Sequence, residues 1–157
     1  MSITISVSQQ RLQLNLLGAA KHYSIATAKN GVGQVMGSER TPLGKHRIRA
    51  KIGAGVQANS VFVGRRPTGE VYSAKLAEQY PDRDWILTRI LWLCGNQPGL
   101  NRMGDVDTMR RYIYIHGAPD SHPMGVPSSH GCIKMHNHDV IELFDKVTVG
   151  MDVCIEP

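Results

Sequence analysis

The stretch that most constrains the fold is the alternating run of tyrosine and isoleucine over residues 112–115, which His116 and Gly117 follow. Alternation of aromatic and β-branched residues predicts a buried strand, and Gly117 ends it. This strand would carry His116 to its end, at the edge of the fold. The 16 glycines of the chain also suit a protein built from many turns. We therefore expect a mainly β protein.

Other segments repeat the same period of two. Ile3–Val7 and Leu12–Leu16 predict a hairpin, and Lys21–Ala28 predicts a third strand. Further strands are expected over residues 46–52, 61–63, 85–93 and 147–155, although a buried helix over 85–93 stays open. Short helices are expected over Ala74–Tyr80 and from Asn137, as N-cap, to about Lys146. The predicted fold is one domain, residues 1–157, that forms a strand-rich sandwich with one or two short helices.

A second segment, from Pro127 to Met135, places a cysteine directly behind a serine, a histidine and a glycine. A cysteine is a nucleophile only as the thiolate, and a nearby imidazole can take its proton. Gly131 lets the backbone bend sharply and bring N–H groups toward a developing oxyanion. A single cysteine is more often a small buried side chain, so the hypothesis depends on the combination of Cys132 with His116 and His130.

His116-Gly117 together with Ser129-His130-Gly131-Cys132 resembles the signature of the L,D-transpeptidase catalytic domain family, also called YkuD-like. Upstream, Thr41-Pro42-Leu43-Gly44 resembles the Thr-Pro-x-Gly segment of that family. The first hairpin and the closing strand match as well, so the resemblance covers nearly the whole chain. It implies an L,D-transpeptidase-like β-sandwich.

The resemblance also implies roles for individual residues. Cys132 would attack a peptide carbonyl and form a thioester, and His116 would be the base, oriented by the carbonyl of Gly117. Backbone amides around Gly131 and Cys132 would bind the oxyanion. The family often has arginine two residues after the cysteine, where this chain has Lys134, which keeps the charge and lacks the planar fork.

Four residues are expected to contact substrate: Ser129, His130, Lys134 and Arg102. Arg102 belongs to the polar, glycine-rich loop of residues 96–107, which precedes the His116 strand and is expected to lie over the cleft. A solvated loop arginine explains Arg102 equally well.

Charge and the N-terminal sequence limit the partners. The net charge of +5 favours anionic ligands, but the basic residues are scattered, so nucleic acid is not expected. No apolar run approaches a membrane span. Met1–Val7 lacks the features of a signal peptide, which predicts a cytoplasmic protein. Cys94 and Cys154 lie in apolar runs and are expected in the core. No cofactor is expected, and the oligomeric state stays open.

Three functions compete. Histidines gather near Cys132, but their spacing fits no usual zinc pattern, so no metal is expected. A non-catalytic wall-binding module would have no need of Cys132 and His116. Within the enzyme interpretation, the thioester passes either to an amine, as in an L,D-transpeptidase, or to water. A cytoplasmic location favours water, and hence an L,D-carboxypeptidase that releases terminal D-Ala from peptidoglycan-derived tetrapeptides during muropeptide recycling.

Overall fold

A computed structural model describes all 157 residues of the chain and confirms the mainly β class. The strands are β1 Ser2–Ser6, β2 Arg11–Leu16, β3 Ala19–Ala26, β4 Gly44–Ile52, β5 Ser60–Val63, β6 Arg66–Val71, β7 Ile86–Gly95, β8 Tyr114–Ala118, β9 Ile133–His136 and β10 Asp152–Glu156. Two α-helices, α1 Ala74–Gln79 and α2 Asn137–Lys146, complete the fold. None of the helices is long and apolar enough to cross a membrane.

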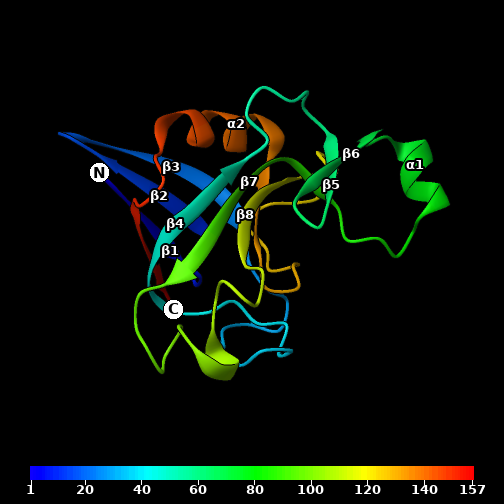
Figure 1. The fold of residues 1–157 in the computed structure, drawn as a ribbon. Coiled ribbons are helices and arrows are strands. Elements are labelled where there is room, and N and C mark those ends of the chain that lie inside the picture. The colour runs from blue at the N-terminus through cyan, green and yellow to red at the C-terminus, as the bar shows by residue number, and fades with distance from the viewer.

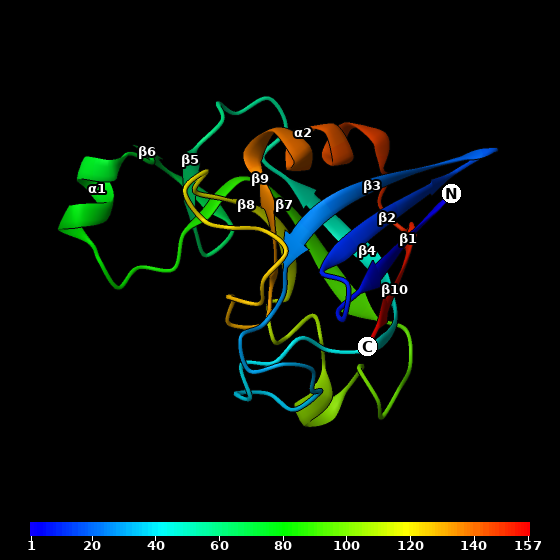
Figure 2. The same cartoon turned by 180° about the vertical axis from the view of Figure 1, so that it is seen from behind.

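All ten strands belong to one sheet, in the order β4-β10-β1-β2-β3-β9-β8-β7-β5-β6. An additional pairing between β4 and β7 closes the sheet on itself, so the expected sandwich takes the form of a barrel-like ring (Figure 1). β5, β6 and α1 lie outside this ring and project to one side of it (Figure 2). β8 and β9 are neighbours and run parallel, which places the predicted base, His116, on one strand and the predicted nucleophile, Cys132, directly before the next.

The main core fills the ring and continues under α2. Strand alternation sends Ile3, Ile5, Leu12 and Leu14 inward, where each side chain is almost fully buried. α2 covers this core with an apolar face that includes Val140, Leu143 and Phe144. α2 also contacts β7, β8 and β9, so it supports the part of the sheet that carries His116 and Cys132.

Several local expectations are wrong. The strand expected over residues 147–155 begins only at Asp152. Residues 65–69, Arg-Arg-Pro-Thr-Gly, predict a turn, but the turn is restricted to Gly64 and Arg65, and the following residues form β6, an edge strand that tolerates Pro67. Asn137 is not the N-cap of α2. That position belongs to His136, and the Asn137 side chain is buried instead.

Cys94 and Cys154 are also outside the core. Both are half-buried, because their inward-facing neighbours on the same strands, Leu93 and Val153, occupy the interior. In a strand, consecutive side chains point to opposite faces, so the two cysteines lie on the outer face of the sheet.

Candidate active site

The Cys132 thiol is held between two backbone groups of the chain that leads into β8. It accepts a hydrogen bond from the Tyr114 N–H at 3.3 Å and donates one to the Tyr112 carbonyl at 3.4 Å. Tyr112 adopts a left-handed backbone conformation, with φ of 55°, which is uncommon for a residue with a side chain. The thiol is therefore fixed at the start of β9, beside the start of β8.

His116 lies on the same face of the sheet as Cys132. In the parallel pairing of β8 with β9, His116 is opposite Lys134, and side chains two residues apart on a strand share a face. Its Nδ1 is 2.7 Å from the Gly117 carbonyl oxygen. Because a carbonyl only accepts, Nδ1 carries the proton and Nε2 keeps its lone pair. No protein group bonds to Nε2, which leaves it available as a base.

Both reacting groups are neutral in the resting site. Burial raises the pKa of the Cys132 thiol to about 12, and the Tyr114 N–H and the positive charge of Arg111 oppose this only in part. Burial also lowers the pKa of His116, although its bond to Gly117 acts in the opposite direction. A thiol and an imidazole in these states do not form an ion pair at neutral pH. The thiolate must instead form as His116 removes the proton.

The loop before Cys132 is braced from inside the protein. Ser129 is buried, accepts from the Gly131 N–H at 3.2 Å and donates to the Cys132 carbonyl at 2.5 Å. Thr41 is buried as well and donates to the Gly131 carbonyl at 2.9 Å. Thr41 belongs to the Thr-Pro-x-Gly segment, so this segment holds the cysteine loop in place.

These contacts leave one free donor beside the thiol. The Gly131 N–H, an expected oxyanion donor, is taken by Ser129. The Cys132 N–H makes no hydrogen bond within the protein. Gly131 has φ of 131°, and an added Cβ would lie 3.2 Å from Ile113 Cδ1 and 3.3 Å from the Arg40 carbonyl oxygen. Glycine at this position therefore allows the turn that presents the Cys132 N–H.

Cys132 opens into a cavity of about 510 Å³. Two arginines, Arg65 and Arg111, line it together with Asp84 and the exposed His130. Arg65 sits at the β5–β6 turn and donates to the Tyr114 hydroxyl at 3.0 Å. Neither arginine could be assigned to the site from the sequence. Each is distant from Cys132 in the chain and reaches the cavity only in the folded protein.

A second hollow of about 330 Å³ adjoins the first, since Asp84 and His130 line both. Lys134 lies in this second hollow and is 8% exposed. Its ammonium donates to the Ser128 hydroxyl at 3.1 Å. Burial lowers the pKa of Lys134, and the negative charge of Asp84 opposes that change. Lys134 therefore places a cation next to the Cys132 cavity, and Asp84 and His130 lie between the two.

The remaining expected contact residue lies elsewhere. Arg102 lines a pocket on β4 and β7 that has no residue in common with the Cys132 cavity. Its neighbour Asn101 is fully buried and donates to the carbonyls of Leu43 and Lys45 at 3.1 and 3.0 Å. The loop of residues 96–107 is therefore fastened to the start of β4.

A buried polar network supports β8 from behind. Thr88 donates to the Asn137 side-chain oxygen at 2.5 Å, and Asn137 donates to Asn59 at 2.9 Å. Thr88 has φ of 74°, a strained conformation for a β-branched residue. A Cβ on Gly117 would approach Asn137 Oδ1 to 2.5 Å, so the network and the carbonyl that orients His116 are in close contact.

The histidines of residues 116–138 do not converge. No three histidine, cysteine, aspartate or glutamate side chains come close enough together to hold a metal ion. His136 and His138 stack on each other with ring centroids 5.8 Å apart, and the His138 side chain is 80% exposed.

The comparisons with known proteins agree with this geometry. The family described as the L,D-transpeptidase catalytic domain matches residues 1–155. Among solved structures, L,D-transpeptidase 3 from Mycobacterium tuberculosis has 16% identity and a TM-score of 0.59, over 99% of this chain and 60% of that one. An L,D-transpeptidase from Mycobacterium smegmatis has 15% identity and a TM-score of 0.56, over 99% and 58%. The present chain thus spans about three fifths of those proteins. No curated protein sequence matches it.

Proposed function

Because the chain belongs to the L,D-transpeptidase catalytic domain family, a family of cysteine-dependent enzymes, we propose that it is an acyl-transfer enzyme acting on peptidoglycan stem peptides, with hydrolysis as its main reaction. One observation carries the proposal: Cys132 opens into a cavity, and His116, on the same face of the neighbouring strand, keeps its Nε2 free. The proposed substrate is a tetrapeptide that ends in D-Ala, and the proposed activity is that of an L,D-carboxypeptidase.

The first half of the reaction transfers the acyl group to sulfur. His116 Nε2 takes the thiol proton as Cys132 Sγ attacks the carbonyl carbon that precedes D-Ala. The oxyanion of the tetrahedral intermediate accepts from the Cys132 N–H. His116 then gives its proton to the departing nitrogen, the C–N bond breaks, and D-Ala leaves. The product is a thioester on Cys132.

The second half of the reaction returns the enzyme to its starting state. His116 takes a proton from water as the water oxygen attacks the thioester carbonyl. The C–S bond then breaks, and the sulfur recovers a proton from His116. A shortened peptide with a free carboxylate is released. An amine in place of water would give an exchanged or cross-linked peptide.

Two features of the cavity support water as the acceptor. The mouth is open, since both shared rim residues, Asp84 and His130, are exposed. Arg65 and Arg111 line the cavity, and like charges repel, which disfavours an acceptor that arrives as an ammonium ion. At the leaving end, Lys134 offers a cation for the carboxylate of D-Ala.

We also propose a cytoplasmic location, with soluble muropeptides or precursors as donors. All three cysteines are free thiols, which fits a reducing compartment. Cell fractionation would test the location directly.

Product analysis tests the reaction. Purified protein is incubated with a disaccharide-tetrapeptide, with and without a D-amino acid, and the products are weighed by mass spectrometry. Release of D-Ala with addition of water is expected, and Cys132→Ala abolishes it while leaving the fold intact. Cys154→Ala is the matched control and retains activity. Efficient D-amino-acid exchange with little hydrolysis would assign the protein as an L,D-transpeptidase instead.

A further inference from the structure

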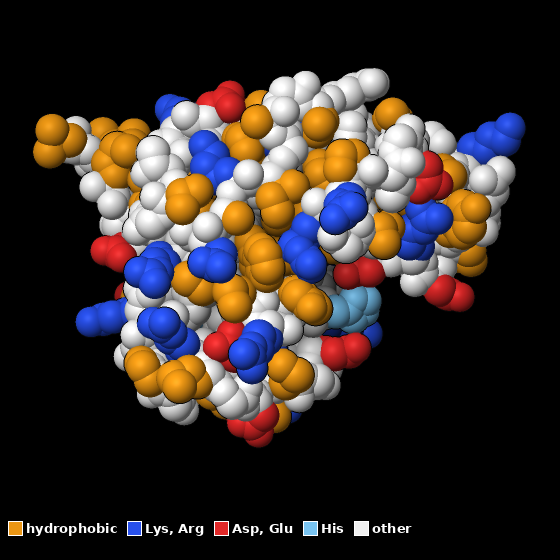
Figure 3. All heavy atoms as spheres, in the orientation of Figure 1, with side chains coloured by type: hydrophobic (Ala, Val, Ile, Leu, Met, Phe, Trp, Pro, Cys, Tyr) orange, Lys and Arg blue, Asp and Glu red, His pale blue; other side chains and the backbone are white.

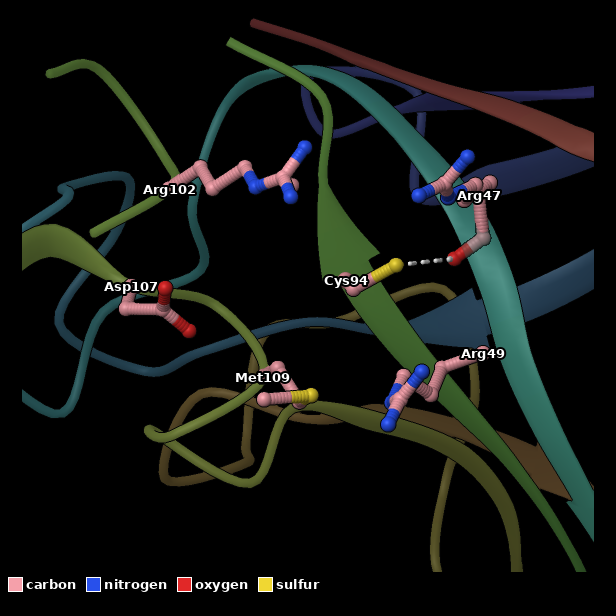
Figure 4. Close-up of a pocket in the computed structure, with 7 residues that line it drawn as sticks. Arg47, Arg49, Cys94, Arg102, Asp107 and Met109 are labelled. Atoms are coloured by element: carbon pink, nitrogen blue, oxygen red, sulfur yellow. Dashed lines mark hydrogen bonds between the residues drawn. The ribbon is translucent and has the colours of Figure 1, made fainter. Parts of the chain in front are cut away.

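Three arginines surround the pocket that Arg102 lines, on the outer face of the sheet. Arg47 and Arg49 come from β4, Arg102 comes from the loop of residues 96–107, and Cys94 of β7 lies between them (Figure 4). The pocket has a volume of about 230 Å³, several times the ~30 Å³ of one water molecule. Lysine and arginine side chains gather over this face of the molecule (Figure 3).

The three guanidinium groups are uncompensated. None of them makes a hydrogen bond or an ion pair within the protein, and each side chain is exposed. Asp107 is the only acidic residue that lines the pocket. Its carboxylate already accepts from the Met103 N–H at 2.6 Å and the Arg110 N–H at 3.0 Å. With three positive charges and one negative charge, the pocket suits an anion that carries more than one charge.

The backbone around the pocket is fixed because the loop of residues 96–107 packs against β4 and β7. On the loop side, Thr108 is buried and lies 2.9 Å from His46 Nε2, and His46 belongs to β4. Gly95, at the end of β7, is packed so closely against Asn101 that a Cβ would collide with the Asn101 backbone. The loop that carries Arg102 therefore keeps a fixed position relative to Arg47 and Arg49 on β4.

This pocket shares a face of the sheet with Cys132. The pairings run from Cys132 beside Tyr114 on β8, to Trp92 on β7, to Ala50 on β4. Three strand spacings of about 4.8 Å separate the ends of this row by about 14 Å. Trp92 forms a bridge of packed side chains between them: its ring centroid is 6.2 Å from that of Tyr114, and its Nε1–H donates to the Met109 carbonyl at 3.1 Å. Met109 itself lines the arginine pocket.

The arginine pocket lies on the side of Cys132 opposite to the leaving group. Lys134 lies two residues beyond Cys132 along β9, whereas Cys94 lies toward the opposite end of the neighbouring strands. The leaving D-Ala and the arginine pocket thus lie on opposite sides of the nucleophile. Arg47 is opposite Cys94, two residues beyond Trp92, so its backbone lies farther from Cys132 than the ~14 Å to Ala50. Three extended residues span about 10–11 Å, which is shorter than this separation. A group held by the arginines therefore belongs beyond the stem peptide and not to its nearest side chain.

We propose that Arg47, Arg49 and Arg102 form a subsite for a diphosphate carried by the donor at the far end of its stem peptide. This rests on the proposed function for the identity of the donor, and it selects a nucleoside-diphosphate-linked sugar tetrapeptide over a phosphate-free muropeptide. Arginine is suited to the task because its planar fork pairs with two phosphate oxygens at once.

The first test measures binding without catalysis. Inorganic pyrophosphate is titrated into the full chain by calorimetry at low and moderate salt. Arg47→Gln and Arg102→Gln are each expected to weaken binding roughly tenfold, the usual effect of losing a charge-assisted hydrogen bond. Arg11→Gln removes an exposed arginine of β2 and is the matched control for net charge. Equal affinity in wild type and the pocket variants, or an equal loss in Arg11→Gln, overturns the proposal.

The second test compares two donors that differ only in the diphosphate. The linked donor is expected to have the lower KM, and Arg47→Gln raises that KM without changing kcat/KM for the phosphate-free donor. Equal use of both donors by the wild type overturns the assignment to the donor. If neither donor is hydrolysed while pyrophosphate binding still depends on the pocket arginines, the proposed function fails and the anion site stands.

Discussion

The protonation states of Cys132 and His116 make a quantitative prediction about reactivity. With a pKa of about 12, the thiol is ionised in roughly one molecule in 10⁵ at pH 7. An ordinary cysteine of pKa ~8.5 is ionised in roughly one molecule in 30 at that pH. Alkylation of Cys132 by iodoacetamide should therefore be slow at neutral pH and rise about tenfold per pH unit to beyond pH 9.

Turnover should depend on His116 over the same range of pH. General-base assistance contributes typically 10²–10⁴-fold, so His116→Ala should lower acylation by about that factor near pH 7 and by less as the pH rises. His130→Ala is the matched control: it removes an exposed imidazole that is close to Cys132 in sequence and makes no hydrogen bond with the thiol.

The measurement uses the Cys94→Ala/Cys154→Ala background, so that only Cys132 is labelled, and follows modification by mass spectrometry from pH 6 to 10. A rate that is flat from pH 6 to 9 in the wild type would refute the reasoning, because it indicates a preformed thiolate–imidazolium pair. A larger loss of acylation in His130→Ala than in His116→Ala would transfer the role of base to His130.

Three further predictions concern stability, the cysteine loop and substrate binding. Burial lowers the pKa of His46 to about 4, so the unfolded chain binds more protons between pH 6.5 and 4. The free energy of unfolding should fall by ~3 kcal/mol as the pH drops through that window, and chemical denaturation of His46→Gln should show a smaller drop. Gly131→Ala should cost ~1–3 kcal/mol in the same assay and abolish turnover, because φ of 131° is strained for alanine; unchanged activity would contradict this. Lys134→Ala should raise KM for a carboxylate-ended tetrapeptide more than for its amidated analogue, and Lys134→Arg should be tolerated; equal effects on both peptides would remove Lys134 from carboxylate binding.

The strands and the family could be predicted because their signals are local. Alternation of side chains along Ile3–Val7 is a property of a few consecutive residues, and it marks the strand and its buried face together. The alternation over residues 112–115 located its strand less well, because β8 runs from Tyr114 to Ala118 and Gly117 lies inside it. The motif around Cys132 is local as well. The closure of the sheet is different, since it depends on β4 pairing with β7, whose paired residues lie 38 (Ile52 and Ile90) to 49 (His46 and Gly95) positions apart in the chain. No pattern within either strand specifies that partner.

The same limit applies to the residues around the nucleophile. Thr41 fixes the cysteine loop through contacts with two distant backbone groups, the Ala28 N–H and the Gly131 carbonyl, and its sequence context marks only a turn. Ser129 belongs to the motif itself, but its bonds to Gly131 and Cys132 are known only once the loop is folded. Arg102 is a residue that the sequence placed wrongly. Its glycine-rich loop precedes the His116 strand and was expected over the cleft, but Asn101 fastens that loop to the start of β4, on the far side of Trp92. The signal that would have separated these cases is burial, because a buried polar side chain must find partners.

The strained segment of β7 explains why the base depends on residues outside the motif. The pairing of β7 with β8 shifts between Leu87 and Ile90, opposite Gly117 and His116, so Thr88 and Arg89 form a bulge where the base sits. Thr88 keeps its left-handed conformation because Asn137 accepts its hydroxyl and the Asn59 N–H donates to the same oxygen at 3.0 Å. Asn137 in turn packs against Gly117, whose carbonyl sets the His116 tautomer. Orientation of the base is thus a property of β7, β8 and α2 together, which is why two short motifs identify the reacting residues and cannot by themselves position them.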